Sequence, residues 1–285
     1  MTKIDQFESV FKAAVKEVYS YRRIEFLRVL VVTDLEPLAI GPLVAQVRDF
    51  LSCIDSNETD WRSLSGAEFD SVQSLLDRVA AEGPDLIVTW RHLHSNAWQW
   101  GHSLGEYLDV LTQSTTCPVV VLPHPDANHA LPHSMTDTDR VMAITDHLVG
   151  DERLVNYSLA LTDQAGTCWL THVEGERQFA RYTEAISKIP SLDTKEATFA
   201  LLEQLLKEPR DYIDSCRNAI AEVELNVQVE DIVTLGNRVS EYRRLVEEHE
   251  VDLLVMNTMD GDQLAMHGQA YPLAVELRSI PLLLL

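Results

Sequence analysis

The chain has 285 residues, of which 46% are hydrophobic and 24% charged, and its formal net charge is −22 at pH 7. These values predict a globular protein of about two domains and argue against a nucleic-acid or anionic-membrane partner, because such binding relies on clustered Lys and Arg. No run approaches the roughly 18 consecutive apolar residues of a membrane span, so we expect no membrane partner and a cytoplasmic protein.

Cysteine usage fits a reducing compartment. The four cysteines are Cys53, Cys117, Cys168 and Cys216, and no two of them form a C-x-x-C pair. Cys117 and Cys168 lie in apolar runs of strand-like composition, where buried thiols are common. We therefore expect reduced, structural thiols.

The first predicted element is an amphipathic helix within residues 1–27. Its apolar positions recur at helical spacing on one stripe, which consists of Phe7, Val10, Phe11, Ala14, Val15 and Val18. We expect this N-terminal helix to cover part of the first sheet, where the chain that follows is short of other elements.

Residues 28–123 are predicted to form a first α/β domain. The short apolar strand "RVLVVTD" (Arg28–Asp34) is followed by helix-forming stretches, by the strand "DLIV" (Asp85–Val88) and by a final strand entered through Pro118. Residues 124–139 are rich in Pro, Asn, Asp and Ser, which is typical of a linker loop.

Residues 140–285 alternate strands and helices more completely. Strands are predicted at "RVMAIT", "TCWLTHV", "VQVEDIVTLG", "DLLV" and the C-terminal "PLLLL", with a helix-forming stretch between each pair. Short aliphatic strands that alternate with helices imply an α/β fold with a mostly parallel sheet and helices on both faces.

Three matches recur in the same order in the two domains, so the chain contains an internal repeat. "RVLVVTD" returns as "RVMAITD", "DLIV" as "DLLV", and "CPVVVLP" as "IPLLLL". The first repeat is shorter, because 51 positions separate Asp34 from Asp85 whereas 106 separate Asp146 from Asp252. We therefore expect two tandem repeats of a five-stranded open sheet, of which the first has lost or reduced at least one strand–helix unit.

These features resemble the universal stress protein domain, here in tandem. In each half a first strand ends in Asp, and after the "DLIV" or "DLLV" strand a glycine opens a helix. Twelve positions later a residue precedes Pro and an aliphatic strand, an offset that holds from Gly105 to Cys117 and from Gly268 to Ile280. The resemblance covers nearly all of residues 140–285 but only the two ends of residues 28–123. It implies the adenine-nucleotide alpha-hydrolase-like fold.

Nucleotide-binding members of this family are expected to carry Gly-x2-Gly-x9-Gly-Ser/Thr, in which glycines let backbone N–H groups approach the phosphates. Both repeats depart from this pattern. In the first repeat Trp90 stands at the first glycine position, and Glu106 replaces the hydroxyl residue. In the second repeat Asn257 and Asp260 stand at the first two glycine positions, the loop is shorter, and Gln269 replaces Ser/Thr.

The resemblance leaves two sets of candidate nucleotide-binding residues. The second repeat offers Asp146, Asn257, Gly268 and Gln269, whereas Asp34 and Gly105 mark a first site that we expect to be degenerate. The aspartates and glycines also have a structural interpretation, which we favour: a carboxylate at a strand end caps the next helix, and a glycine permits a turn.

Aromatic side chains and histidines gather between residues 90 and 133. We expect Trp90, Trp98 and Trp100 to fill the space of a nucleotide, the alternative being a platform for a ligand or partner.

The histidines of this segment are the main rival signal. His124, His129 and His133 lie in the predicted linker, and their spacing fits no usual closed zinc pattern, so we favour solvated side chains and expect no metal site. A metal-responsive protein that uses the segment from His92 to His133 is a third alternative.

The sequence contains no G-x-S-x-G motif, no Cys–His arrangement that indicates activation and no acid–base pair with a telling spacing, so we expect no enzyme. The favoured interpretation is a universal stress protein-like, non-enzymatic stress-response or regulatory protein that acts through protein contacts and uses no cofactor. The alternative is a stress sensor that binds ATP or another adenine nucleotide in the second repeat.

The two final strands are expected to cover each other. In this family the last strand of one domain commonly pairs with that of another, and an exposed aliphatic edge such as Leu282–Leu285 invites aggregation. The repeats would then form an intramolecular pseudo-dimer, and we expect either this or a homodimer.

Overall fold

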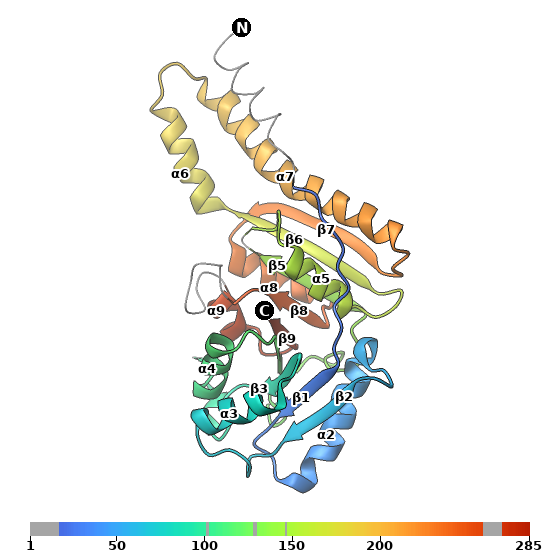
Figure 1. Ribbon diagram of the computed structural model, residues 1–285. Helices are drawn as coiled ribbons and strands as arrows, with labels where there is room; N and C mark the ends of the chain where they lie inside the picture. Colours follow the sequence, from blue (N-terminus) through green and yellow to red (C-terminus); the bar gives the residue numbers. More distant parts are fainter. Residues whose placement is uncertain (1–16, 101–102, 128–129, 146, 259–269) are drawn as a thin grey trace.

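The computed structural model describes residues 17–100, 103–127, 130–145, 147–258 and 270–285. Nine strands in these residues form one continuous sheet in the order β2-β1-β3-β4-β9-β8-β5-β6-β7 (Figure 1). The first half supplies β1 (Arg28–Val32), β2 (Asp60–Leu64), β3 (Leu86–Trp90) and β4 (Val119–Leu122). The second half supplies β5 (Arg140–Thr145), β6 (Thr167–Gly175), β7 (Gln228–Gly236), β8 (Leu253–Met256) and β9 (Leu282–Leu284).

The strand order repeats between the two halves. The second half runs β7-β6-β5-β8-β9 and the first runs β2-β1-β3-β4, so every strand of the first half has a counterpart and β7 has none in the described residues. All pairings are parallel except one. The predicted α/β fold with a mostly parallel open sheet and a shortened first half is therefore confirmed, with the two halves joined in one sheet.

The exceptional pairing is the junction between the halves. Strand β4 pairs antiparallel with β9, with Val119 opposite Leu284 and Val120 opposite Leu283, and these side chains are fully buried. The predicted mutual cover of the two final strands is confirmed. Because each strand shields the other, neither aliphatic run is left as an open sheet edge.

Helices connect the strands in both halves. In the first half they are α2 (Pro37–Phe50), α3 (Val72–Glu82) and α4 (Glu106–Ser114), with short 3₁₀ turns at Ser52–Ile54 and Asn96–Gln99. Local chemistry sets the ends of α3: Ser71 and Ser74 form a capping box at its start, and Gly83, in the left-handed region at φ 56°, ends it. Leu75 and Val79, which are one helical turn apart, face the core.

The second half has five helices in the described residues. They are α5 (Glu152–Ala160), α6 (Glu176–Ser187), α7 (Thr194–Glu222), α8 (Arg238–Glu248) and α9 (Ala270–Glu276). Helices α6 and α7 form a hairpin between β6 and β7 that projects from the body of the protein (Figure 1). We call residues 176–208 of this hairpin the arm. None of the helices in the described residues combines the length and the apolar character needed to cross a bilayer.

The N-terminal segment differs from the prediction of a helix over residues 1–27. Its described part, residues 17–27, contains no helix and runs as a strap over the second half before it enters β1. Tyr19 holds the strap in place: its hydroxyl donates to Asn156 Oδ1 at 2.6 Å, and its ring packs edge-on against Tyr212. Tertiary anchoring of Tyr19 and Phe26 therefore overrides helical periodicity here. Residues 1–16, including the apolar stripe up to Val15, lie outside the described residues.

Candidate functional site

The carboxyl ends of the parallel strands are where open α/β sheets bind ligands, and Asp34 follows β1 at this edge in the first half. Both oxygens of its carboxylate are engaged by the chain itself. Oδ1 accepts from the indole Nε1 of Trp90 at 3.0 Å, and Oδ2 accepts from the backbone N–H of His94 at 2.9 Å. Trp90 is only 1% exposed, so its indole fills the space beside Asp34.

The loop after β3 folds tightly over the same position. His92 and His94 adopt the left-handed backbone region at φ 61° and 57°, and the N–H of His92 donates to the carbonyl of Leu104 at 3.1 Å. Gly105, with φ 93°, allows this approach, because a Cβ there would lie 2.8 Å from the Cα of His92. The structure therefore uses Gly105 for close packing of the loop against the start of α4.

The electrostatics of α4 oppose an anion at this helix start. Glu106 and Asp109 occupy its first turn, where a carboxylate competes with a phosphate for the positive end of the helix dipole. Asp109 is partly buried, and burial raises the pKa of its carboxyl group. Gly66 also packs closely against Asp34, because a Cβ there would lie 2.7 Å from the Asp34 carbonyl oxygen.

Arg91, next to Trp90, connects the two halves. Its guanidinium is buried and donates to the carbonyl of Ala274 from Nε at 3.2 Å and from Nη2 at 2.7 Å, and Nη2 also donates to the carbonyl of Leu277 at 2.9 Å. These acceptors lie at the C-terminal end of α9, where the helix dipole favours a cation. Burial, with a smaller contribution from Arg278, lowers the pKa of Arg91 to about 9, which leaves it charged at pH 7.

In the second half Asn257, the counterpart of Trp90, follows β8. Its amide Nδ2 donates to Asp151 Oδ2 at 2.6 Å, while Asp151 Oδ1 accepts from the N–H of Leu154 and caps α5. A short amide therefore stands where the first half has an indole. The other predicted residues of this site, namely Asp146, Gly268 and Gln269, lie outside the described residues, so the structure brings together only Asn257 and the cap of α5.

Sequence reasoning missed a buried polar pair, His172 and Glu174, near the carboxyl end of β6. His172 and Glu174 point to the same side of β6 and are 6% and 7% exposed, with His172 Nε2 3.5 Å from Glu174 Oε2. Burial lowers the pKa of His172, and the neighbouring carboxylate partly offsets that effect. The alternation of two ionisable residues inside the strand "TCWLTHVEG" was the available signal, but a strand this polar gives no indication of burial on both faces.

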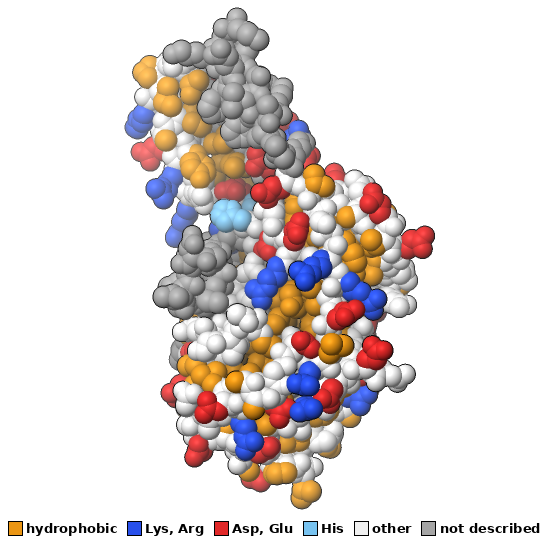
Figure 2. Space-filling model, in the orientation of Figure 1, with side chains coloured by type: hydrophobic (Ala, Val, Ile, Leu, Met, Phe, Trp, Pro, Cys, Tyr) orange, Lys and Arg blue, Asp and Glu red, His pale blue; other side chains and the backbone are white. Residues whose placement is uncertain are grey.

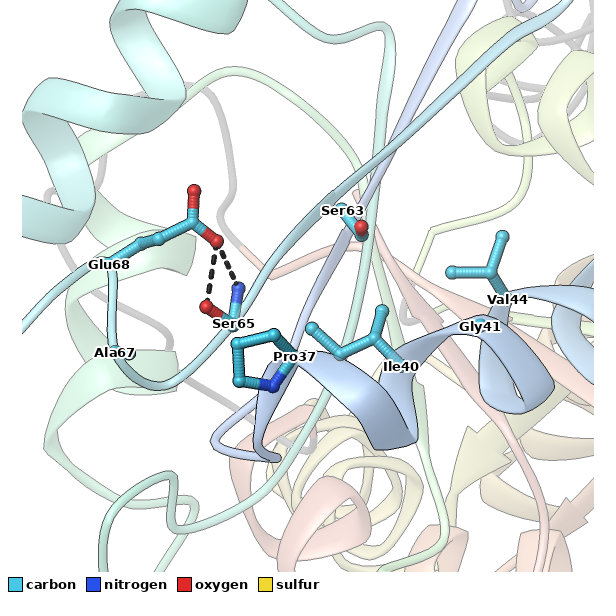
Figure 3. Close-up of a pocket in the computed structure, with 8 residues that line it drawn as sticks. All are labelled: Pro37, Ile40, Gly41, Val44, Ser63, Ser65, Ala67 and Glu68. Atoms are coloured by element: carbon cyan, nitrogen blue, oxygen red, sulfur yellow. Dashed lines mark hydrogen bonds between the residues drawn. The ribbon is translucent and has the colours of Figure 1, made fainter.

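A shallow groove of about 570 Å³ lies between α2 and β2 (Figure 3). Ser65 donates to Glu68 Oε2 from both its N–H and its hydroxyl, at 2.7 and 2.8 Å, so these two side chains are already paired with each other. The strand registers align Ser63 and Ser65 with Leu170 and His172 of β6, a strand that α7 contacts in the second half. The groove thus lies where the described part of the first half has no counterpart of α7, and we assign it no small-molecule ligand.

The histidines do not converge on a metal in the described part of the chain, which contains no group of three or more His, Cys, Asp or Glu side chains with suitable geometry. The ring of His124 stacks on that of Trp98, with 4.6 Å between the ring centroids. Nε2 of His133 lies 3.3 Å from the carbonyl oxygen of Val251. Trp100 is 59% exposed, and His129 lies outside the described residues.

All four thiols are free and at least half-buried. Burial is the main cause that raises the pKa of each to about 12, for Cys53, Cys117, Cys168 and Cys216. Their thiolates are therefore scarce at neutral pH, and the thiols are poor nucleophiles.

No family model and no curated protein matches the chain. Solved structures do match over most of its length, and the three described next are each 13% identical to it. A functionally unknown protein from Pseudomonas aeruginosa PAO1 has a TM-score of 0.51 and covers 91% of this chain and 92% of its own. A protein assigned to the universal stress proteins from Pseudomonas aeruginosa UCBPP-PA14 has a TM-score of 0.51, with 91% and 93% covered. A universal stress protein from Archaeoglobus fulgidus DSM 4304 has a TM-score of 0.52, with 90% and 95% covered.

The chain is thus an α/β protein with an open, mostly parallel sheet. The aspartate at the end of its first strand, Asp34, accepts a hydrogen bond from Trp90 of the same chain. Its fold is that of the universal stress proteins, which confirms the resemblance seen in the sequence motifs. At 13% identity the likeness concerns the fold, and the residues of this chain must carry any statement about binding.

Proposed function

We propose that this is a universal stress protein-like regulatory protein of the cytoplasm that acts through protein contacts, without catalysis and without a nucleotide cofactor in either half. The observation that carries the proposal is the pair of hydrogen bonds from Trp90 and His94 to Asp34. A nucleotide at that position would have to displace a buried indole and leave two donors without partners, which opposes binding.

The second half supports a second candidate function, a sensor of adenine nucleotides. Asn257 is small and leaves no indole over the strand ends, and the structure engages it only with the cap of α5 among the described residues. Backbone N–H groups alone can cradle a phosphate, so the altered loop weakens this candidate without removing it.

A thermal-shift titration with ATP and Mg²⁺ separates the two functions. A ligand that binds only the folded state stabilises it by about 2.7 kcal/mol at a 100-fold excess over its Kd, which is readily measured. The proposed function predicts no shift at millimolar ATP. A clear shift would contradict it and support the sensor.

A matched pair of variants locates any site that is found. Asn257→Trp introduces in the second half the indole that fills the first, and Trp90→Gly removes the indole from the first half. If ATP stabilises the wild type and Asn257→Trp abolishes that shift, the second half binds the nucleotide. If only Trp90→Gly gains a shift, the indole is what closes the first half.

A further inference from the structure

Strand β2 is an open edge of the sheet in the described part of the chain. It pairs only with β1, whereas its counterpart β6 pairs with β5 on one side and with β7 on the other. The N–H of Asp60 donates to the carbonyl of Leu27, toward β1. Because a parallel strand turns the backbone groups of alternate residues to opposite sides, those of Trp61 and Ser63 point away from β1. No strand of the described residues lies beside them.

The two faces of this edge differ. On the α3 face, Arg62 forms ion pairs with Asp60 at 2.8 Å and with Glu82 of α3 at 2.6 Å, and these pairs cover the strand. On the α2 face, the groove described above separates the strand from the helix, which contributes Ile40 and Val44 to its lining (Figure 3). The open backbone of β2 therefore lies next to an apolar groove.

The exposed face of α2 continues this apolar surface. Residues 37–47 are eleven consecutive residues without a charged side chain. Leu38 is 97% exposed, and Pro37, Ala39, Pro42 and Ala45 are exposed as well. Figure 2 shows hydrophobic side chains at the lower end of the molecule, where α2 lies in Figure 1. Contiguous apolar surface of this kind is typical of an interaction site.

The charge around the groove favours a basic partner. Residues 36–68 include six acidic residues and two arginines, and no lysine or histidine. Both arginines are already paired, Arg48 with Asp55 at 3.1 Å and Arg62 as described. Glu36 and Glu58 are exposed, lie just before α2 and β2 respectively, and form no ion pair within the described residues. A cationic segment complements this surface, whereas a second copy of the chain brings the same acidic edge and a net charge of −22.

The second half shows what kind of chain covers the counterpart edge. The strand registers align Ser63 with Leu170 of β6, and Leu170 pairs with Asp231 of β7. Strand β7 is extended over nine residues and buries Val229 and Val233, which lie four positions apart on the same face. An extended segment with apolar residues on one face therefore fits an edge of this geometry.

We propose that β2 and the groove beside α2 bind an extended, basic segment of a partner protein, which adds a strand to the sheet. The backbone of this segment pairs with the outward N–H and carbonyl groups of Trp61 and Ser63, and its apolar side chains enter the groove over Ile40 and Val44. The inference rests on the proposed function, because it names the surface and the class of partner for the protein contacts proposed there.

Fluorescence anisotropy of a labelled peptide, titrated with the full-length protein, tests the proposal. The probe has the sequence of residues 226–236, which contain β7, with Glu230→Lys and Asp231→Lys, so that it keeps the pattern of a strand that covers such an edge and becomes basic. We expect saturable binding that weakens as salt is added. The unmodified acidic peptide should bind roughly tenfold more weakly or less tightly still. No binding of the basic peptide at about millimolar protein would overturn the proposal.

Two variants test whether the peptide binds at this edge. Ser63→Pro removes an N–H that points away from β1 and so leaves the pairing with β1 intact, and Val44→Arg fills the groove. Each should weaken binding roughly tenfold or more. The matched control Gln46→Arg adds the same charge on the exposed side of α2, outside the groove lining, and should change binding less than about threefold. Circular dichroism verifies that the variants are folded, and binding that neither Ser63→Pro nor Val44→Arg weakens would overturn the proposal.

Light scattering coupled to gel filtration tests the competing occupant. A mass that Ser63→Pro leaves unchanged supports the proposal. A wild-type dimer that Ser63→Pro separates would mean that a second copy covers the edge, which contradicts it. Failure of the peptide to bind would overturn this surface alone, because the proposed function fails on a different result, the stabilisation of the protein by ATP.

Discussion

The hydrogen bond between Trp90 and Asp34 is the contact that decides how the first half is interpreted. We predict that Trp90→Phe, which keeps an aromatic ring but removes the indole N–H, destabilises the protein. Asp34→Ala removes the acceptor and leaves both the indole N–H and the backbone N–H of His94 without their partner. The double variant completes a thermodynamic cycle that isolates the shared bond.

The structure sets the size of the effect. Trp90 is 1% exposed, so its N–H has no access to water when the acceptor is lost, and a hydrogen bond to a charged group contributes about 1.5–3 kcal/mol. Trp90→Phe also removes part of a buried ring, which adds a cost of about 1 kcal/mol for lost packing. We therefore expect a loss of about 2–4 kcal/mol for Trp90→Phe and a coupling energy of about 1–2 kcal/mol between the two sites.

Urea unfolding followed by tryptophan fluorescence and circular dichroism measures these quantities, provided that the slope of the transition is the same for all variants. Leu38→Glu serves as a control, because its side chain is on the surface. A coupling energy within about 0.3 kcal/mol of zero would refute the argument, because Asp34 would then be free to bind another group.

Two more predictions concern buried charges. Arg91→Met should lower the free energy of unfolding, measured in urea, by about 2–4 kcal/mol, because the carbonyls of Ala274 and Leu277 lose their donor. Arg91→Lys should have a stability between those of Arg91→Met and the wild type. An Arg91→Met variant as stable as the wild type would refute this. Burial, reinforced by Asp137, raises the pKa of Asp252 to about 7, so the neutral carboxyl is favoured in the folded state and stability falls as the pH rises from about 4 to 7. Asp252→Asn should therefore stabilise the protein at pH 8 by at most about 4 kcal/mol and much less at pH 5; an equal effect at both pH values would contradict the assignment.

Much of the fold could be predicted because its signals are local or repeated. The strand "RVLVV" and its counterpart "RVMAIT" are continuous apolar runs, and the alternation of such strands with helices predicted the parallel architecture. The pairing of β4 with β9 followed from the need to cover two aliphatic edges. The prediction of a helix was wrong for residues 17–27. Hydrogen bonds from Tyr19 to Asn156 and to Ser215 of α7 hold this segment as a strap instead.

The candidate site was harder to predict because it depends on contacts between distant residues. The loss of glycine at position 90 indicated that a phosphate loop was altered, but not that the indole of Trp90 would donate to Asp34, 56 positions away. Similarly, Arg91 gave no sign of binding the end of α9, more than 180 positions along the chain. The state of Asp146, Gly268 and Gln269 stays a prediction.

The sequence by itself determined the order of strands and helices in the second half, the internal repeat and the acidic net charge, but it did not indicate strand β2 of the first half. Periodicity, proline placement and charge are properties of short segments, and the polar segment of β2 lacks such a pattern. Tertiary structure alone decided which carboxylates are already paired, which apolar side chains of the arm are exposed, and how one half holds the other through Arg91. These depend on burial, since a donor or an apolar face gains its energetic value only when the folded chain removes water from around it.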